Sequence, residues 1–183
     1  MLRPIETAYK GYRFRSRLEA RWAVFFDTLG LEYSYEPEGF ALPSGNYLPD
    51  FWLPDVNLRT TAGGPGLWVE IKPVETSDER LEQLAVQSKI PVALVIGLPF
   101  IDDYGVVDEH GSGHYEYSGE RGWDNCMVFI RCPACGRVKF EFSEGNYMNC
   151  ENCGERDIEP SPLLSKAVLA ARGARFEHGE HGT

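Results

Sequence analysis

Apolar residues near the start of the chain recur at the spacing of a helix. Between residues 16 and 29 they lie three or four positions apart, which places them on one face of a helix. These apolar residues are Leu18, Trp22, Phe25, Phe26 and Leu29. Gly30 follows, as a glycine that ends a helix does. The pattern predicts an amphipathic helix over residues 16–29.

Four later segments have the apolar pattern of β-strands. Residues 47–53 and 67–72 are apolar runs joined by the glycine-rich loop RTTAGGPG, which predicts two strands of a hairpin. The loop lacks the Lys-Ser/Thr pair of a phosphate-binding loop. Residues 92–96 form a continuous apolar run, typical of a strand buried on both faces. Residues 31–35 also alternate as a strand does.

Two further helices complete the predicted order of elements. One is expected over residues 77–89, where Thr76 and Glu79 have the spacing of a capping box. An alanine-rich helix is expected over residues 163–175, followed by a disordered tail. The order helix, hairpin strands, helix, strand predicts an α/β fold with a β-rich appendage. We therefore expect the chain to divide into a core over 1–125, a cysteine-rich module over 126–160 and a C-terminal helix with its tail over 161–183.

Length and composition are those of a globular protein. The chain has 183 residues, of which 43% are hydrophobic and 25% are charged, so it can form a core without disulfides. No apolar run is long enough to span a membrane, and the N-terminus lacks an apolar signal core. The expected compartment is therefore the cytoplasm, and no membrane partner is expected.

The charge is distributed unevenly along the chain. A net charge of −10 argues against general coating of nucleic acid, which depends on basic residues displacing counterions. Residues 1–22, however, carry six basic groups against two acids, a local +4, whereas residues 101–124 carry seven acids against one arginine, a local −6. The basic end could dock a phosphate backbone, or it could be an ordinary solvated helix face. The candidate nucleic-acid contacts are Arg13, Arg15, Arg17 and Arg21.

Four cysteines have the spacing of a metal-binding ribbon. Cys132-x-x-Cys135 and Cys150-x-x-Cys153 are each followed by glycine, and the segment VKFEF with the turn around Gly145 predicts a short hairpin between the pairs. Two disulfides or a redox pair are the alternatives, and a reducing compartment disfavours both. Four thiolates would fill the tetrahedral shell of Zn²⁺ and leave no open position for water. The pattern therefore predicts a structural zinc.

Three charged residues lie inside the most apolar segments. Glu70 and Lys72 are two apart in a predicted strand and so share a face, while Val69 and Ile71 face the other way. A half-exposed strand would explain this pair alone. Asp50, preceded by Pro49, lies on the neighbouring predicted strand, and the hairpin can bring it beside Glu70.

A carboxylate on the first helix could join this group. If the helix over 16–29 packs across the sheet, Glu19 lies with Asp50, Glu70 and Lys72, and the local charge is −2. Two unit charges about 4 Å apart interact by about 4 kcal/mol at an effective dielectric near 20, so a divalent cation should neutralise the cluster. Hard carboxylate oxygens favour Mg²⁺ or Mn²⁺. Alternatively, Glu19 closes a capping box with Ser16, by accepting the backbone N–H of Ser16.

One set of residues in this chain resembles the motif of the PD-(D/E)XK nuclease superfamily. In sequence order it is Glu19, then Pro49-Asp50, then Glu70-Ile71-Lys72. The resemblance covers about residues 12–97 and includes the later helix and the buried strand. It implies a restriction-endonuclease-like core with a mixed central sheet flanked by helices. Members of the RecB-like branch carry Gln-x-x-x-Tyr on the following helix, whereas this chain has Gln83-x-x-x-Gln87. The pattern is more similar to small endonucleases, such as those that cleave transposon ends or resolve junctions.

The resemblance also implies a role for each residue of the motif. Asp50 and Glu70 would bind the metal with the Ile71 carbonyl as a possible further ligand, and Glu19 would complete the shell directly or through water. Lys72 would orient the attacking water. The implied activity is metal-dependent hydrolysis of phosphodiester bonds in DNA, with RNA as an alternative substrate. Double-strand cleavage would need a homodimer or a larger complex. There are two competing hypotheses. One is a catalytically idle, nuclease-like module that binds nucleic acid or serves as an adaptor, and the other is a zinc-ribbon protein whose main role is to recruit a partner.

Overall fold

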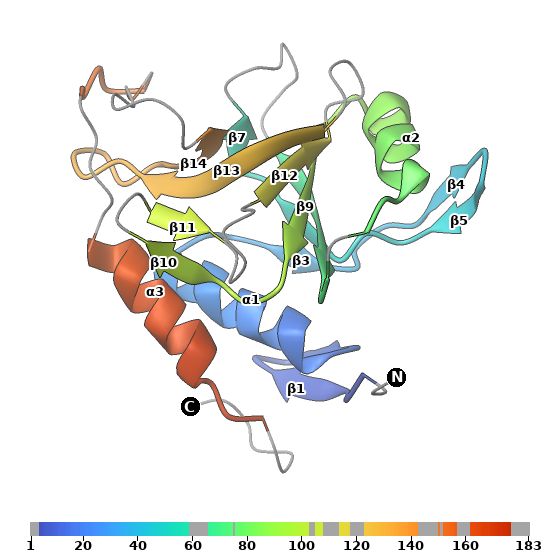
Figure 1. Cartoon of the computed structure of the whole chain (residues 1–183), viewed down its shortest axis with the longest axis horizontal. Helices are drawn as coiled ribbons and strands as arrows, with labels where there is room; N and C mark the ends of the chain where they lie inside the picture. The colour runs from blue at the N-terminus through green and yellow to red at the C-terminus, as the bar shows by residue number, and fades with distance from the viewer. Residues whose placement is uncertain are drawn as a thin grey trace.

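Figure 1 shows a computed structural model of the chain, in which helices flank a mixed β-sheet. The structure describes residues 4–58, 66–74, 76–102, 105–107, 114–117, 123–142, 150, 152–156 and 162–176. The helices in these ranges are α1 (Arg17–Leu29), α2 (Glu79–Ser88) and α3 (Pro162–Gly173). The strands as far as α2 are β1 (Thr7–Tyr9), β2 (Tyr12–Phe14), β3 (Ser34–Tyr35), β4 (Phe40–Leu42), β5 (Gly45–Tyr47), β6 (Phe51–Leu53), β7 (Asn57–Leu58) and β8 (Leu67–Lys72). Those that follow are β9 (Val92–Ile96), β10 (Phe100–Asp102), β11 (Gly105–Val107), β12 (His114–Tyr117), β13 (Trp123–Arg131) and β14 (Val138–Phe142).

The main sheet has the strand order β3-β6-β8-β9-β12-β13-β14-β7. Strands β8 and β9 are parallel and are connected through α2, which makes a βαβ unit. Strand β7 is parallel to β14, and the remaining neighbours in this sheet are antiparallel. The β1–β2, β4–β5 and β10–β11 pairs form separate hairpins. The mixed α/β fold expected from the sequence is therefore present.

Helix α1 begins and ends where the sequence predicts. The Ser16 hydroxyl accepts the backbone N–H of Glu19 at 3.2 Å and caps the first turn. Gly30 adopts a left-handed conformation with φ of 74°, and its N–H donates to the Asp27 carbonyl at 3.0 Å. Both helix ends are thus satisfied locally, and the apolar face between them is free to pack.

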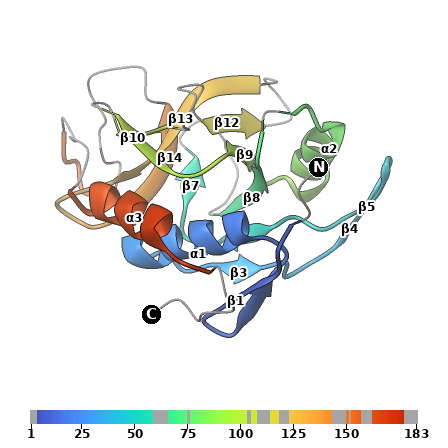
Figure 2. The ribbon, with the colours of Figure 1, turned by 60° about the horizontal axis from the view of Figure 1, so that its bottom comes forward.

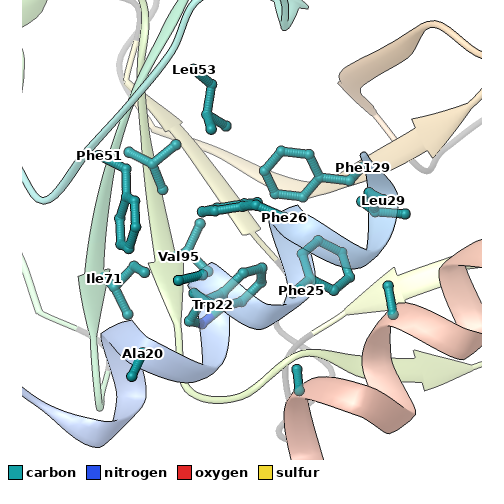
Figure 3. Packing of buried hydrophobic residues seen from close by; sticks show 14 of the residues in the cluster. Ala20, Trp22, Phe25, Phe26, Leu29, Phe51, Leu53, Ile71, Val95 and Phe129 are labelled. Atoms are coloured by element: carbon teal, nitrogen blue, oxygen red, sulfur yellow. The ribbon is translucent and has the colours of Figure 1, made fainter. Parts of the chain in front are cut away.

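The main core lies between α1 and the sheet (Figure 3). Trp22, Phe25 and Phe26 are fully buried, and the ring of Phe26 meets the rings of Phe51 and Phe129 edge to face. Aromatic pairs in this geometry contribute about 0.5–1.5 kcal/mol beyond the area they bury. Helix α3 packs along α1, as Figure 2 shows, and it also contacts β13 of the sheet. Helix α1 is therefore packed against both the sheet and α3.

A second, smaller core lies on the opposite face of the sheet. Leu81 and Leu84 of α2 pack there with Trp68 of β8 and Leu94 of β9. Neighbouring residues of β8 divide between the two faces, since Ile71 belongs to the main core and Trp68 to the smaller one. The alternation predicted for this strand is confirmed.

Several predicted boundaries were wrong. The strand predicted over 31–35 is only β3, and the helix predicted over 163–175 is α3, which begins one residue earlier and ends two residues earlier. Helix α2 begins at Glu79 rather than at residue 77, and its cap is Asp78, whose carboxylate accepts the backbone N–H of Arg80 at 3.2 Å. That carboxylate also binds the Arg80 guanidinium. Asp78 therefore has the capping role that the sequence assigned to Thr76. The strand predicted over 47–53 is split into β5 and β6, because Pro49 has no N–H to donate to a sheet.

The cysteine-rich segment continues the main sheet. Strand β13 pairs with β12 and β14, and Phe129 of β13 reaches the main core. VKFEF is thus β14, and it pairs with β13 across the first cysteine pair. The turn around Gly145, the acidic side chains of 101–124 and the tail over 177–183 lie outside what the structure describes. The three-part division of the chain stays a prediction. Across the described ranges, every helix is too short or too polar to span a lipid bilayer.

Candidate functional site

A cavity of about 670 Å³ opens at the end of the main sheet, beside the start of α1. Its walls come from the segment before α1, the first turns of α1, the bend between β5 and β6, the end of β8 and the turn after β9. All four polar residues of the predicted catalytic motif line it, and they are Glu19, Asp50, Glu70 and Lys72. The fold therefore brings together side chains that lie up to 53 positions apart in the sequence.

Asp50 is held between β8 and the segment before α1. The carboxylate is almost fully buried, and its Oδ2 accepts the backbone N–H of Ile71 at 2.8 Å. Its Oδ1 accepts from Nη2 of Arg15 at 2.6 Å. Burial, followed by the charges of Glu70 and Glu19, raises the pKa of Asp50 well above its usual range, although Ile71 and Arg15 oppose the shift. The three carboxylates therefore repel one another through a poorly solvated space.

Glu70 and Lys72 project from the same face of β8 and form an ion pair through Glu70 Oε1. The Glu70 side chain is only 5% exposed. Its other oxygen, Oε2, is buried without a hydrogen-bond donor among the described residues. Such an acceptor normally has a partner, because an unsatisfied buried polar group costs about 1–3 kcal/mol. This oxygen lies near the Tyr47 hydroxyl, and within the described residues it is not held by a hydrogen bond of good geometry.

Tyr47 is a neighbour of this cluster that the sequence did not reveal. Its ring is buried, and burial, followed by the nearby charge of Glu70, raises the pKa of its hydroxyl. The hydroxyl has no hydrogen bond of good geometry within the described part of the chain. The Tyr47 hydroxyl thus interacts with the Glu70 carboxylate without reaching the geometry of a full hydrogen bond.

Glu19 caps α1 and lines the cavity at the same time. Its Oε1 accepts from the Ser16 hydroxyl at 2.7 Å, and its Oε2 accepts from the Tyr35 hydroxyl at 2.5 Å and from the backbone N–H of Arg15 at 3.1 Å. The predicted bond to the Ser16 backbone N–H was wrong, because the carboxylate reaches one residue further back along the chain. Tyr35 is a second residue that the sequence did not reveal, since it comes from the distant strand β3. The role of Glu19 as a metal ligand stays a prediction.

The basic residues at the N-terminal end divide into two groups. Arg13 pairs with Glu6 at 2.5 Å, and Arg15 pairs with Asp50 and, through Nε, with Glu36 at 2.5 Å. No carboxylate in the described ranges pairs with Arg17 or Arg21, which both line the cavity. They are four residues apart on α1 and so share one face. Their charge remains available to a ligand in the cavity.

The four cysteines gather at the end of the sheet formed by β13 and β14. The Sγ atoms of all four lie within 4.8 Å of one another, and the closest approaches are 3.6 and 3.7 Å. Four sulfur ligands about 2.3 Å from one tetrahedral ion would stand about 3.8 Å apart. All four thiols are free. The cluster could hold a structural metal ion and is compatible with zinc.

The backbone builds the two cysteine turns alike. In the first turn, the Gly136 N–H donates to the Cys132 carbonyl at 2.9 Å, and in the second the Gly154 N–H donates to the Cys150 carbonyl at 2.7 Å. Both glycines have positive φ, of 75° and 78°, which other residues adopt at a cost. Hydrogen bonds from the Arg137 backbone and from Asn152 lower the pKa of the Cys135 thiol to about 6, whereas the pKa of the Cys153 thiol in the same cluster is raised.

The two candidate metal sites differ in how closely their ligands approach. Of the residues that the structure describes, only the four cysteines bring three or more Cys, His, Asp or Glu ligand atoms within reach of one ion. The carboxylates of Glu19, Asp50 and Glu70 share the cavity, but Arg15 and Lys72 lie among them. Comparisons with models of protein families, with curated proteins and with solved structures gave no match to this chain. Its function must therefore be argued from the site.

Proposed function

We propose that the protein is a metal-dependent endonuclease that hydrolyses phosphodiester bonds in DNA. Asp50 and Glu70 hold Mg²⁺ or Mn²⁺, with Glu19 and the Ile71 carbonyl as further ligands. A bound ion of this kind lowers the pKa of a coordinated water and offsets charge on the phosphate. Lys72 orients the attacking water, and Arg17 and Arg21 bind the phosphate backbone at the mouth of the cavity.

The observation that carries this proposal is the state of Glu70. Its side chain is 95% buried next to Asp50, yet within the described residues Oε2 has no hydrogen bond of good geometry. A carboxylate that served only to stabilise the fold would have both oxygens satisfied. A buried carboxylate with one loosely held oxygen, on a residue that lines a cavity, fits a cation that enters from the cavity. Among the described residues, neither histidine nor cysteine lines the cavity, which favours a hard ion such as Mg²⁺.

The fold gives independent support. The three acidic residues come from α1, from the bend before β6 and from β8, and β8 continues through α2 into the parallel buried strand β9. This is the order of elements that the resemblance to the PD-(D/E)XK superfamily implies. The helix, the acidic bend and the Glu-x-Lys strand also converge on one cavity. The proposal includes a structural zinc at the four cysteines, which would fix the end of the sheet.

A cleavage assay tests the nuclease directly. Single-stranded, duplex, flapped and four-way DNA and a matched RNA are incubated with the protein and Mg²⁺ or Mn²⁺, and products are separated under denaturing conditions. We expect cleavage that EDTA stops and that Asp50→Ala abolishes. Asp55→Asn serves as the matched control, since Asp55 is exposed and lies outside the cavity wall. No cleavage of any substrate by folded, zinc-loaded protein would contradict the proposal.

One observation favours the alternative of an idle nucleic-acid-binding or adaptor module. Arg15 and Lys72 already pair with Asp50 and Glu70, so protein cations compensate two of the carboxylates. On this account the protein binds DNA with the same affinity with and without Mg²⁺, and Asp50→Ala leaves that affinity unchanged. Electrophoretic mobility shifts on the same substrates distinguish the two functions.

A further inference from the structure

Arg15 holds the oxygen of Asp50 that a metal ion would need. Asp50 Oδ2 is occupied by the Ile71 N–H at 2.8 Å, and Oδ1 is occupied by Arg15 Nη2 at 2.6 Å. Nε of Arg15 binds Glu36 at 2.5 Å, so the guanidinium bridges two carboxylates. A dication held by Asp50 at this oxygen would meet the guanidinium. Two cations close together in a poorly solvated space repel strongly.

The side chain of Arg15 is free to leave while its backbone stays in place. It is 54% exposed, whereas the side chain of Asp50 is 3% exposed. Its backbone N–H donates to Glu19 at 3.1 Å and to the Tyr35 hydroxyl at 3.0 Å, and a change of rotamer preserves both bonds. The arginine can therefore swing towards solvent without disturbing the cap of α1.

A phosphate in the cavity would give Arg15 another partner. Arg15 lines the same cavity as Arg17 and Arg21, and a guanidinium binds a phosphate through two parallel hydrogen bonds. We infer that Arg15 is a built-in counter-cation: it occupies Asp50 when nucleic acid is absent and transfers to a backbone phosphate when nucleic acid binds, which opens Asp50 to the divalent ion. This inference rests on the proposed nuclease site.

The exchange couples the two ligands. Nucleic acid that withdraws Arg15 strengthens binding of the metal, and by thermodynamic reciprocity the metal strengthens binding of nucleic acid by the same factor. Coupling of this kind typically changes affinity by about 5–150-fold. Little divalent ion would then remain in the cavity while no substrate is present.

Manganese titration followed by electron paramagnetic resonance tests the exchange without using activity. The concentration of free Mn²⁺ is measured in solutions of the zinc-loaded chain. The same titration of Asp50→Asn gives the Mn²⁺ bound at other sites, which is subtracted. Without DNA, we expect Arg15→Gln to bind Mn²⁺ at least about fivefold more tightly than the wild type. Arg13→Gln is the matched control in this DNA-free titration, because it removes an arginine that pairs with Glu6 and has no recorded contact with Asp50. It should match the wild type.

The second arm adds a short phosphorothioate DNA duplex, with the Mn²⁺ that DNA alone binds subtracted. When the duplex is added, the Mn²⁺ affinity of the wild type should rise at least about fivefold, and that of Arg15→Gln should rise less than about twofold. Should Arg15→Gln fail to fold, Arg15→Lys replaces it, and its DNA-free affinity should lie above that of the wild type, since lysine cannot bridge Asp50 and Glu36 as arginine does.

The outcomes separate this inference from the function on which it rests. Equal Mn²⁺ affinity of the wild type and the Arg15 variants, all abolished by Asp50→Asn, overturns the exchange and leaves the metal site intact. Mn²⁺ binding that Asp50→Asn does not reduce in any protein overturns the metal site itself, and the exchange with it.

Discussion

The cysteine cluster and the carboxylate cluster are both candidate metal sites, and they are built in opposite ways. The four thiols converge within 4.8 Å on two turns that repeat the same backbone hydrogen bonds. The carboxylates come from three separate elements, and Arg15 and Lys72 compensate two of them. A structural ion needs a closed shell that is formed with the fold, whereas a catalytic ion needs ligands that can also face water and substrate. The difference thus matches the two roles proposed for these sites.

Removing the metal from the cysteine cluster should have the largest effect. Binding to such turns is coupled to their folding, with apparent free energies of about 10–16 kcal/mol in small zinc modules. We expect one tightly held zinc per chain, and we expect Cys150→Ser to increase amide exchange over the two cysteine turns, 132–136 and 150–154, while sparing α1 and β8. Elemental analysis and hydrogen exchange measure both. Protein purified without chelator that contains no zinc would contradict the prediction.

Reducing the charge of the carboxylate cluster should stabilise the metal-free protein, whereas loss of a cysteine ligand should destabilise it. Because burial and the neighbouring carboxylates raise the pKa of Asp50, its ionised form destabilises the fold at neutral pH. Asp50→Asn should therefore raise the metal-free melting temperature. Mg²⁺ at about 100 times its Kd should stabilise the wild type by about 2.7 kcal/mol and leave this variant unchanged. Scanning calorimetry measures the melting temperatures of both proteins with and without Mg²⁺. If Mg²⁺ shifts the two melting temperatures equally, the ion binds elsewhere.

Glu19 allows the structural and chemical roles of one carboxylate to be separated. Glutamine can accept from Tyr35 and from the Arg15 N–H through its oxygen and donate to Ser16 through its amide, so the contacts of Glu19 are largely preserved. Glu19→Gln should change stability by only about 0.5 kcal/mol. It should slow metal-dependent cleavage at least about tenfold, which is about 1.4 kcal/mol of transition-state stabilisation. Full cleavage activity in this variant would restrict Glu19 to capping.

Ser16→Ala is the counterpart of that variant and should have the smallest effect. It removes the hydroxyl that caps α1 and binds Glu19, at a cost of about 1 kcal/mol in the free energy of unfolding. Cleavage by the folded protein should stay within about twofold of wild type, because no predicted metal ligand is lost. Urea denaturation and the cleavage assay measure the two effects. A loss of activity as large as that of Glu19→Gln would mean that capping and chemistry cannot be separated here.

The parts of the structure that the sequence predicted depend on local patterns. The span of α1, the strands β8 and β9 and the facing of Glu70 and Lys72 follow from apolar periodicity and from the capping residues Ser16 and Gly30. The convergence of Glu19, Asp50 and Glu70 on one cavity was anticipated because a helix that packs on a hairpin brings its first turn to the strand ends. The cysteine cluster was anticipated from spacing alone.

What the sequence did not reveal depends on contacts between distant segments. No local pattern marks Tyr35 as the partner of Glu19, or Tyr47 as the neighbour of Glu70, because each comes from a different hairpin or strand. Arg15 was predicted as a contact to nucleic acid, and its pairing with Asp50 is a feature of the tertiary fold. Pro49 carried a signal that was missed, since its lack of an N–H indicates the break between β5 and β6.

A crystal of the full chain with Mn²⁺ and uncleaved DNA, measured by anomalous scattering on either side of the manganese edge, tests the central claim most directly. The account predicts manganese between Asp50 and Glu70, a separate zinc at the four cysteines, and the Arg15 guanidinium on a backbone phosphate. Zinc at the cysteines with no manganese in the cavity, and Arg15 still paired with Asp50, would contradict it.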